Sequence, residues 1–270
     1  MAGYGCSKEQ LIEKVEGNLM SQAILKTEHL NVAADRPILK NITIAFRSAA
    51  ITAVIGPSGS GKTTLLRAFN RLNEDHLSTS GRVLFQGINI YDPRVDCYRL
   101  RMKIGMLPSQ PIIFPISLKA NLMLAPRVNM KVSRQNLAMD IEQSLRQVCL
   151  WDKLQHQLAN KQFKLNTKDQ QLFCLARALL LHPQILLLDE PTALLDPAAT
   201  LQFEKILLKL RSHLTIIIVT HNLQQAARIA DDTAFLQHGK LIEFAQTREL
   251  FTRPQQAATD QYLTKKLILK

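Results

Sequence analysis

The sequence has no long hydrophobic run and no paired cysteines. No apolar stretch approaches the roughly 20 residues that a membrane-spanning helix needs, and residues 1–20 have no apolar core of a signal peptide. No C-x-x-C motif occurs, which argues against a zinc site or a disulfide framework and favours a reducing compartment. We therefore expect a protein that reaches a membrane only by docking to something embedded there. The four cysteines are Cys6, Cys97, Cys149 and Cys174.

Acidic residues are in short supply. The 270 residues include 34 Lys and Arg against 22 Asp and Glu, so the net charge is +12. A basic balance suits anionic partners such as nucleotides, nucleic acid or the anionic face of a membrane, although a well-solvated surface explains it equally well. The hydrophobic share of 46% is ordinary for a soluble globular protein and is enough for a sizeable core.

Glycine is scarce, with 10 in the chain, and three of them stand in the stretch GPSGSGKTT. This stretch lies between the apolar run AAITAVI and the helical LLRAFNRL, and it fits the pattern G-x-x-x-x-G-K-[ST]. The backbone of such a loop cradles phosphate, Lys62 reaches the β- and γ-phosphates, and the Thr63 hydroxyl binds Mg²⁺. A chance match arises in on the order of one per cent of such chains. We predict a nucleotide-binding loop that consists of Gly56, Pro57, Ser58, Gly59, Ser60, Gly61, Lys62, Thr63 and Thr64.

The hydrophobic pattern predicts an α/β fold. Strands are expected between Ile24 and Phe46 with a turn at AADRP, and hairpins are expected in GRVLFQGINIY and at Gly239. The runs AAITAVI, QILLLDE and LTIIIVTH read as buried strands that alternate with helices, which indicates a parallel sheet covered on both faces. The middle third is expected to be helical, because Leu137, Ile141, Leu145 and Val148 recur at helical spacing after a possible Ser133 cap.

Polar residues end two of these buried strands. Asp189 and Glu190 end ILLLDE, and His221 ends IIIVTH. Ligands of open parallel sheets gather where strands end, so we expect Asp189 to hold Mg²⁺ and Glu190 to orient or deprotonate an attacking water. The alternative is an acid pair that only caps the next turn. A lone histidine at a strand end is more often structural, whereas one on the same sheet can reach the γ-phosphate.

Three stretches in this order resemble the ATP-binding subunits of ABC transporters over about residues 23–262: GPSGSGKTT, LARALLLHPQILLLDEPTALLD and IIIVTHNLQQAARIADDTAFLQHGKL. The stretches IYDPRVD, FPIS and ELFTRPQQAATDQYL are similar to the branch that serves phosphate import. The resemblance implies a phosphate-loop NTPase core with a mostly parallel sheet, an antiparallel β subdomain and an inserted helical subdomain. It also implies ATP and Mg²⁺ as cofactors and catalytic roles for Glu190 and His221.

The chain departs from this family at the signature turn. The family has Leu-Ser-Gly-Gly-Gln there, and this sequence has LNTKD at residues 165–169. Two added Cβ atoms and the charges of Lys168 and Asp169 then stand where the family brings backbone N–H groups to the γ-phosphate of ATP held by a partner subunit. The alternative interpretation is an ordinary helix start with Asn166 as its N-cap.

Two further departures concern nucleotide contacts. A glutamine that touches Mg²⁺ in the family aligns with Ser109, so Gln110, one residue later, is predicted as a metal-binding residue beside Thr63 and Asp189. The aromatic residue that stacks on adenine in the family has no counterpart near Asn31–Asp35.

From these observations we expect an N-terminal extension at residues 1–22, an ATP-binding domain at 23–262 and a basic tail at 263–270. The helical subdomain is expected at about 111–181, with the insertion near 111–165 contacting membrane subunits. The resemblance implies a second ATP-binding subunit, two membrane-spanning permease subunits, a periplasmic phosphate-binding protein that acts indirectly, and a peripheral place on the cytoplasmic face of the inner membrane.

Three functions remain open at this level. The first is an ATP-hydrolysing subunit of a phosphate importer, and the second is a regulatory nucleotide-binding subunit with weak or no hydrolysis because of the altered turn. The third is a soluble ATPase that acts on nucleic acid, which the charge permits, although the chain has neither tandem cassettes nor a long coiled coil and no nucleic acid is expected as partner.

Overall fold

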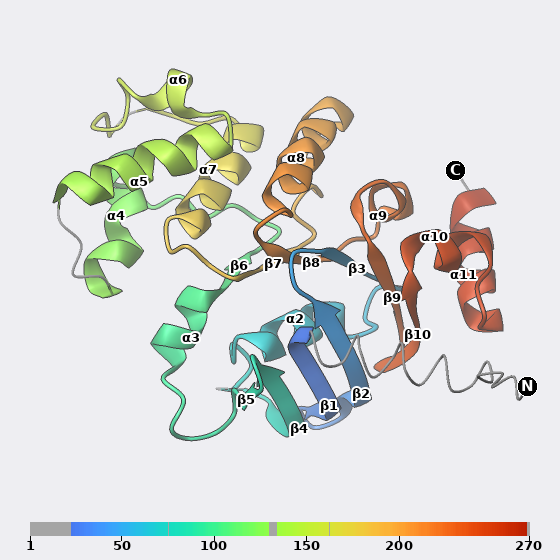
Figure 1. The fold of residues 1–270 in the computed structure, drawn as a ribbon. Helices are drawn as coiled ribbons and strands as arrows, with labels where there is room; N and C mark the ends of the chain where they lie inside the picture. The colour runs from blue at the N-terminus through green and yellow to red at the C-terminus, as the bar shows by residue number, and fades with distance from the viewer. Residues whose placement is uncertain (1–22, 75, 130–133, 162, 269–270) are drawn as a thin grey trace, which may run out of the picture.

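A computed structural model describes residues 23–74, 76–129, 134–161 and 163–268. The N-terminal part of this structure is a small antiparallel sheet with strand order β2-β1-β4-β5 (Figure 1). The strand pairings confirm the predicted strands with a turn at AADRP and the predicted hairpin in GRVLFQGINIY. The strands are β1 (Ala23–Ala33), β2 (Pro37–Arg47), β4 (Ser78–Phe85) and β5 (Ile88–Asn89).

A second, six-stranded sheet has the order β10-β9-β3-β8-β7-β6. All neighbours are parallel except the β9–β10 hairpin, which turns at the predicted Gly239. Every residue of β3, β7 and β8 is buried, because helices or the small sheet cover both faces. The six strands are β3 (Ile51–Ile55), β6 (Ile104–Leu107), β7 (Ile185–Asp189), β8 (Thr215–Val219), β9 (Asp232–Gln237) and β10 (Lys240–Gln246).

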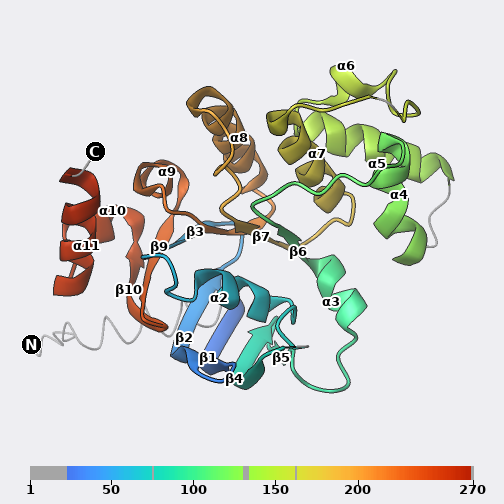
Figure 2. The same cartoon turned by 180° about the vertical axis from the view of Figure 1, so that it is seen from behind.

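Successive residues of the central strands contribute to two different hydrophobic clusters. Val54 packs in a cluster with the small sheet and α2 (Lys62–Phe69), so α2 lies between the two sheets (Figures 1 and 2). Ala53 and Ile55 belong to the other cluster, on the far face, with the helices described next. This alternation is the two-residue period of a strand buried on both sides.

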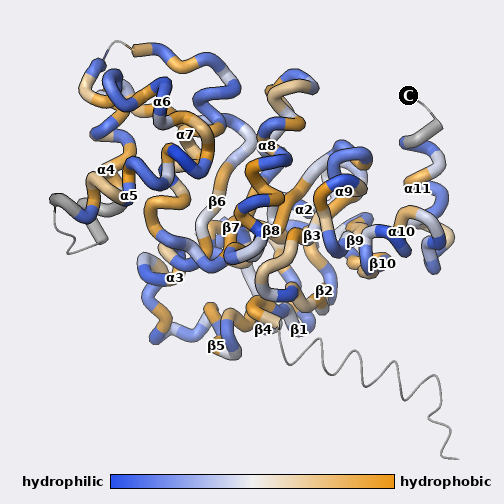
Figure 3. Tube along the Cα trace, turned by 45° about the horizontal axis from the view of Figure 1, so that its top comes forward, coloured by the Kyte–Doolittle hydropathy of each residue, from blue (hydrophilic) through white to orange (hydrophobic). Residues whose placement is uncertain are grey.

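The middle of the chain forms a helical layer at one end of the molecule, as predicted. In Figure 3 its helices alternate between hydrophilic and hydrophobic stretches, in contrast to the hydrophobic central strands. Ile141, Leu145 and Val148 are buried and Leu137 packs against them; the expected Ser133 cap lies outside the described residues. The helices of this layer are α4 (Leu118–Asn129), α5 (Arg134–Gln147), α6 (Trp151–Leu154) and α7 (Thr167–Leu179). The short helix α3 (Cys97–Lys103) precedes β6 and lies outside the layer, and its buried Leu100 packs in the cluster of the small sheet (Figure 1).

The C-terminal third returns to the six-stranded sheet. A helix lies between β7 and β8, as the predicted alternation of strands and helices requires, and a last helix runs through the expected boundary at 262/263. Among the described residues, no helix is both long and apolar enough to span a membrane. The elements are α8 (Pro197–Leu210), α9 (Leu223–Ile229), α10 (Thr247–Thr252) and α11 (Ala257–Ile268).

Candidate functional site

The glycine-rich loop joins the end of β3 to the start of α2, as the sequence predicts. Its backbone conformation favours glycine at two positions where an added Cβ would also meet a close neighbour. A Cβ on Gly56 would lie 2.0 Å from the Leu236 carbonyl oxygen, and one on Gly61 would lie 2.7 Å from a methyl carbon of Leu39. Gly61 has φ +100° and caps α2. The packing therefore fixes a tight turn at the N-terminus of a helix, where backbone N–H groups favour anions.

The Lys62 side chain is folded back into this loop. It is 5% exposed, and its Nζ donates hydrogen bonds to the carbonyl oxygens of Gly56 (3.0 Å) and Pro57 (2.8 Å). Burial lowers the pKa of Lys62 below the ordinary lysine value, and the negative charges of Glu190 and Asp189 oppose that shift. The loop thus holds a desolvated cation close to two carboxylates.

Thr63 and Asp189 lie together although they are far apart in the sequence. The Thr63 hydroxyl donates to Asp189 Oδ1 at 2.9 Å, and Asp189 is 8% exposed at the end of β7. Hydroxyl and carboxylate oxygens are the ligands that Mg²⁺ prefers. The chemistry of this pair therefore fits the predicted metal site.

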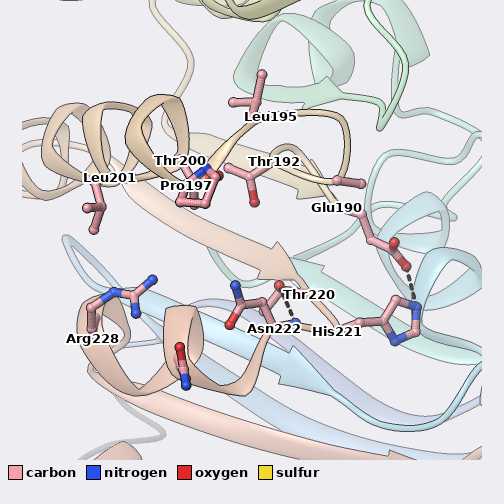
Figure 4. A pocket seen from close by; sticks show the side chains of 12 residues that line it. Glu190, Thr192, Leu195, Pro197, Thr200, Leu201, Thr220, His221, Asn222 and Arg228 are labelled. Carbon is pink, nitrogen blue, oxygen red and sulfur yellow. Dashed lines mark hydrogen bonds and ion pairs between the residues drawn. The ribbon is translucent and has the colours of Figure 1, made fainter. Parts of the chain in front are cut away.

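Glu190 and His221 form a second close pair. Their Oε1 and Nε2 atoms are 2.6 Å apart, and a dashed line in Figure 4 marks this contact. The adjacent parallel strands β7 and β8 account for the pairing, because Asp189 is in register with Val219 and both side chains follow at the same edge. Glu190 has φ +47°, an uncommon conformation for a residue other than glycine, and its N–H donates to the Val219 carbonyl at 2.9 Å. The pair lines one end of a cavity of about 430 Å³.

A buried polar network supports the loop after Glu190, and the sequence analysis did not identify it. Gln225, which is fully buried, donates to the Thr192 hydroxyl at 3.0 Å and to Glu204 Oε1 at 3.3 Å. Arg228 makes two hydrogen bonds to Glu204, and it lies with Thr192 in the cavity of Figure 4. The helix α9 carries Gln225 and begins two residues after His221, so the network connects the loop after Glu190 to the helix that follows His221.

The altered turn of residues 165–169 is the well-formed start of α7. Asn166 is the N-cap, and its side-chain oxygen accepts a hydrogen bond from the Asp169 N–H at 2.8 Å. Asp169 is 2% exposed and forms an ion pair with Lys153, whereas Lys168 Nζ approaches Gln202 Oε1 at 3.4 Å. These side chains are engaged in holding the helix and its neighbours.

Gln110 was predicted to bind metal together with Thr63 and Asp189, but it does not contact them in the structure. It is exposed and follows β6, the edge strand next to β7, by three positions. No contact within the described part of the chain joins it to Thr63 or Asp189. It lies on the loop that leaves the same edge of the sheet.

Comparison with known proteins agrees with this geometry. A family model described as ABC transporter matches residues 39–193. The phosphate import ATP-binding protein PstB of Thermotoga maritima is 45% identical over 232 residues, which are 85% of this chain and 92% of the relative. PstB 1 of Lactobacillus acidophilus is 42% identical over 241 residues, which are 88% of this chain and 91% of the relative.

Solved structures have the same fold. The structure of cbiO1 from Clostridium perfringens, part of the ABC transporter complex cbiONQ, superposes with a TM-score of 0.76 at 27% identity and covers 92% of this chain and 96% of that chain. An ATP-bound bacterial Atm1-family ABC exporter has a TM-score of 0.75 at 21% identity, over 97% of this chain and 47% of that chain, which supports the fold alone. From the family match and the two curated relatives, the chain belongs to the ABC transporter family, alongside its phosphate import ATP-binding proteins.

Proposed function

We propose that this protein is the ATP-binding and ATP-hydrolysing subunit of a membrane importer for inorganic phosphate. The observation that carries the proposal is the close Glu190–His221 pair at the edge of the sheet that also carries the phosphate loop. Phosphate as the solute rests on the 45% identity to a phosphate import ATP-binding protein. Closure on ATP drives transport, and hydrolysis resets the subunit.

The phosphate loop binds the nucleotide. Its backbone N–H groups and the N-terminus of α2 hold the phosphates, and Lys62 exchanges its two carbonyl partners for phosphate oxygens. Thr63 and Asp189 would hold Mg²⁺, and the ion would supply positive charge that offsets the negative charge of the phosphates. Gln110, on the adjacent loop, would be an additional ligand of the ion. The loop residues that bind ATP are Gly56, Pro57, Ser58, Gly59, Ser60, Gly61, Lys62, Thr63 and Thr64.

Glu190 and His221 carry out the hydrolytic step. A water oxygen attacks the γ-phosphorus, the bond to the β–γ bridging oxygen breaks, and the proton of the water passes to Glu190. His221 contacts the γ-phosphate, and its hydrogen bond to Glu190 fixes the direction of the carboxylate. The network of Thr192, Gln225 and Glu204 keeps the following loop in place.

The protein acts with other subunits. We expect a second ATP-binding subunit, two permease subunits and, indirectly, a periplasmic phosphate-binding protein, at the cytoplasmic face of the inner membrane. Residues 23–262 form the ATP-binding domain between an extension at 1–22 and a tail at 263–270. Its helical part at about 111–181 docks on the permease, and exposed Ile112, Phe114 and Ile116 suit such a contact.

The regulatory alternative predicts ATP binding without turnover. The structured start of α7 favours it, whereas the intact Glu190–His221 pair and the relatives favour hydrolysis.

Steady-state ATPase assays distinguish the two functions. We expect the wild-type protein to hydrolyse ATP, Glu190→Gln to bind ATP with a rate reduced at least a hundredfold, and Lys62→Ala to lose binding, because proton transfer and phosphate contacts are removed separately. Glu249→Gln, an exposed carboxylate on α10, is the matched control and should leave the rate unchanged. ATP binding without any Glu190-dependent turnover would support the regulatory function instead. Phosphate-stimulated ATPase activity in vesicles with the membrane subunits of a phosphate importer tests the solute.

A further inference from the structure

The C-terminal helix α11 packs next to the phosphate loop. A pocket of about 560 Å³ lies between them. One wall is Pro57 of the loop together with Gln237 of β9, and the other wall consists of α11 residues Ala258, Gln261, Tyr262, Lys265 and Lys266. The order of the sheet explains the placement, because β9 separates α11 and β10 from β3 and its loop (Figures 1 and 2).

Tyr262 connects this helix to the first residue of the loop. Its ring stacks on Phe235 with centroids 4.8 Å apart, and Phe235 is in register with Ile55, which immediately precedes the loop. Its buried hydroxyl lies by the Gly56 backbone yet makes no hydrogen bond of good geometry with any residue in the described part of the chain. Burial raises the pKa of this hydroxyl, so it keeps its proton at neutral pH. A buried donor without a partner requires a functional or structural explanation.

Lys266 lies four positions after Tyr262, on the same face of α11. It is exposed, lines the pocket and forms no salt bridge with a described residue. Its positive charge acts on Lys62 in the direction opposite to Asp189 and Glu190. The loop therefore has a second cation nearby, supplied by a helix some 200 positions further along the chain.

We propose that α11 is part of the nucleotide site, with Tyr262 as a positioning residue for the phosphate loop and Lys266 as a cation that favours nucleoside triphosphates. The inference rests on the proposed ATP binding by the loop. When Lys62 turns to the phosphates, the carbonyls of Gly56 and Pro57 lose their donor, so this segment of the loop needs other support. The Tyr262 hydroxyl lies by the Gly56 backbone, and its side chain lines the same pocket as Pro57. Lys266 adds an attraction that grows with the negative charge of the ligand.

Isothermal titration of ATP and ADP tests this, with all proteins in a Glu190→Gln background so that ATP is not consumed. We expect Tyr262→Phe to keep the ring stack and raise the Kd of both nucleotides about fivefold, the typical value of one neutral hydrogen bond. We expect Lys266→Gln to raise the Kd of ATP about threefold at low salt and that of ADP less, with both effects shrinking at high salt. Lys209→Gln on α8 makes the same charge change away from the pocket and should have no effect.

The outcomes separate this inference from the proposed function. Failure of the background protein to bind ATP would refute the function itself. Normal ATP affinity in both Tyr262→Phe and Lys266→Gln would overturn the inference, as would a lowered melting temperature of Tyr262→Phe without any change in Kd. An equal loss of affinity in Lys209→Gln would show that the effect comes from net charge, which also overturns the role of Lys266.

Discussion

At the edge of the six-stranded sheet, Glu190 and His221 pair at 2.6 Å and face a cavity, whereas at the start of α7 the side chains of Asn166 and Asp169 are engaged by the helix and by Lys153. Both regions present polar residues at the end of a regular element. In the first, buried residues supply hydrogen bonds to the loop after Glu190, and the acid and the imidazole line the cavity. At the start of α7, the polar side chains themselves make the hydrogen bonds and the ion pair that hold the helix. A polar cluster is therefore available to a ligand only where other residues supply the hydrogen bonds that hold the surrounding backbone.

The largest effect should come from filling the tight turn at the sheet edge. Gly56→Ala places a Cβ 2.0 Å from the Leu236 carbonyl oxygen, which is held in strand β9. We expect loss of ATP binding and a fall of at least 3 kcal/mol in the free energy of unfolding, roughly the range of severe core strain. Gly59→Ala is the matched control, because no atom lies within 4 Å of its Cβ, and its positive φ should cost only about 1 kcal/mol. Urea unfolding measures the stability of both variants, and titration measures their affinity for ATP. Equal losses in Gly56→Ala and Gly59→Ala would contradict the structure.

Restoring the family's signature tests the other region. The variant with Asn166→Ser, Thr167→Gly, Lys168→Gly and Asp169→Gln loses the ion pair with Lys153 and gains two flexible positions, so unfolding free energy should fall by about 2 kcal/mol. The ATPase rate should rise by roughly ten- to a hundredfold, because groups that donate hydrogen bonds to the γ-phosphate replace the bulky and charged side chains. Addition of Glu190→Gln should abolish the gain. A less stable protein with an unchanged rate would show that this turn takes no part in hydrolysis.

The smallest effect distinguishes two helix caps. Asn166 caps α7 and Asn222 caps α9, each by accepting a hydrogen bond from the N–H three residues on. Replacement by alanine should cost about 1 kcal/mol of stability in either case. Only Asn222→Ala should also lower the ATPase rate severalfold, because the loss of this cap loosens the chain next to His221. Thermal unfolding and ATPase rates are measured for both variants. A similar loss of rate in Asn166→Ala would show that the start of α7 also takes part in hydrolysis.

Much of the fold follows from local patterns in the sequence. The buried strands β3, β7 and β8 are short apolar runs, and the loop between β3 and α2 has a glycine-rich motif in which Gly56 and Gly61 are closely packed. The helix α5 is marked by apolar residues at helical spacing. These elements are predictable because their determinants lie within a few neighbouring residues.

From the sequence, only the site residues that directly follow a buried strand were predictable. Asp189, Glu190 and His221 each follow an apolar run, so their shared edge can be inferred from the topology of a parallel sheet. Gln225 and Glu204 lie on two different helices, and Tyr262 acts through a helix packed on β9, so no spacing in the sequence brings them together. Asn166 was the exception, because its role as an N-cap is a local one, and the hydrogen bond to Asp169 confirms that interpretation.

The place of β3 within its sheet also bears on how the protein is made. Its two neighbours, β8 and β9, both come from the C-terminal third of the chain, after the entire helical layer. During synthesis, β3 and its loop therefore leave the ribosome long before either partner strand exists, and both edges of β3 stay unpaired in the nascent chain. A chain that stops before β9 has no Leu236 against which Gly56 can pack, so translation must be nearly complete before the nucleotide loop acquires its shape.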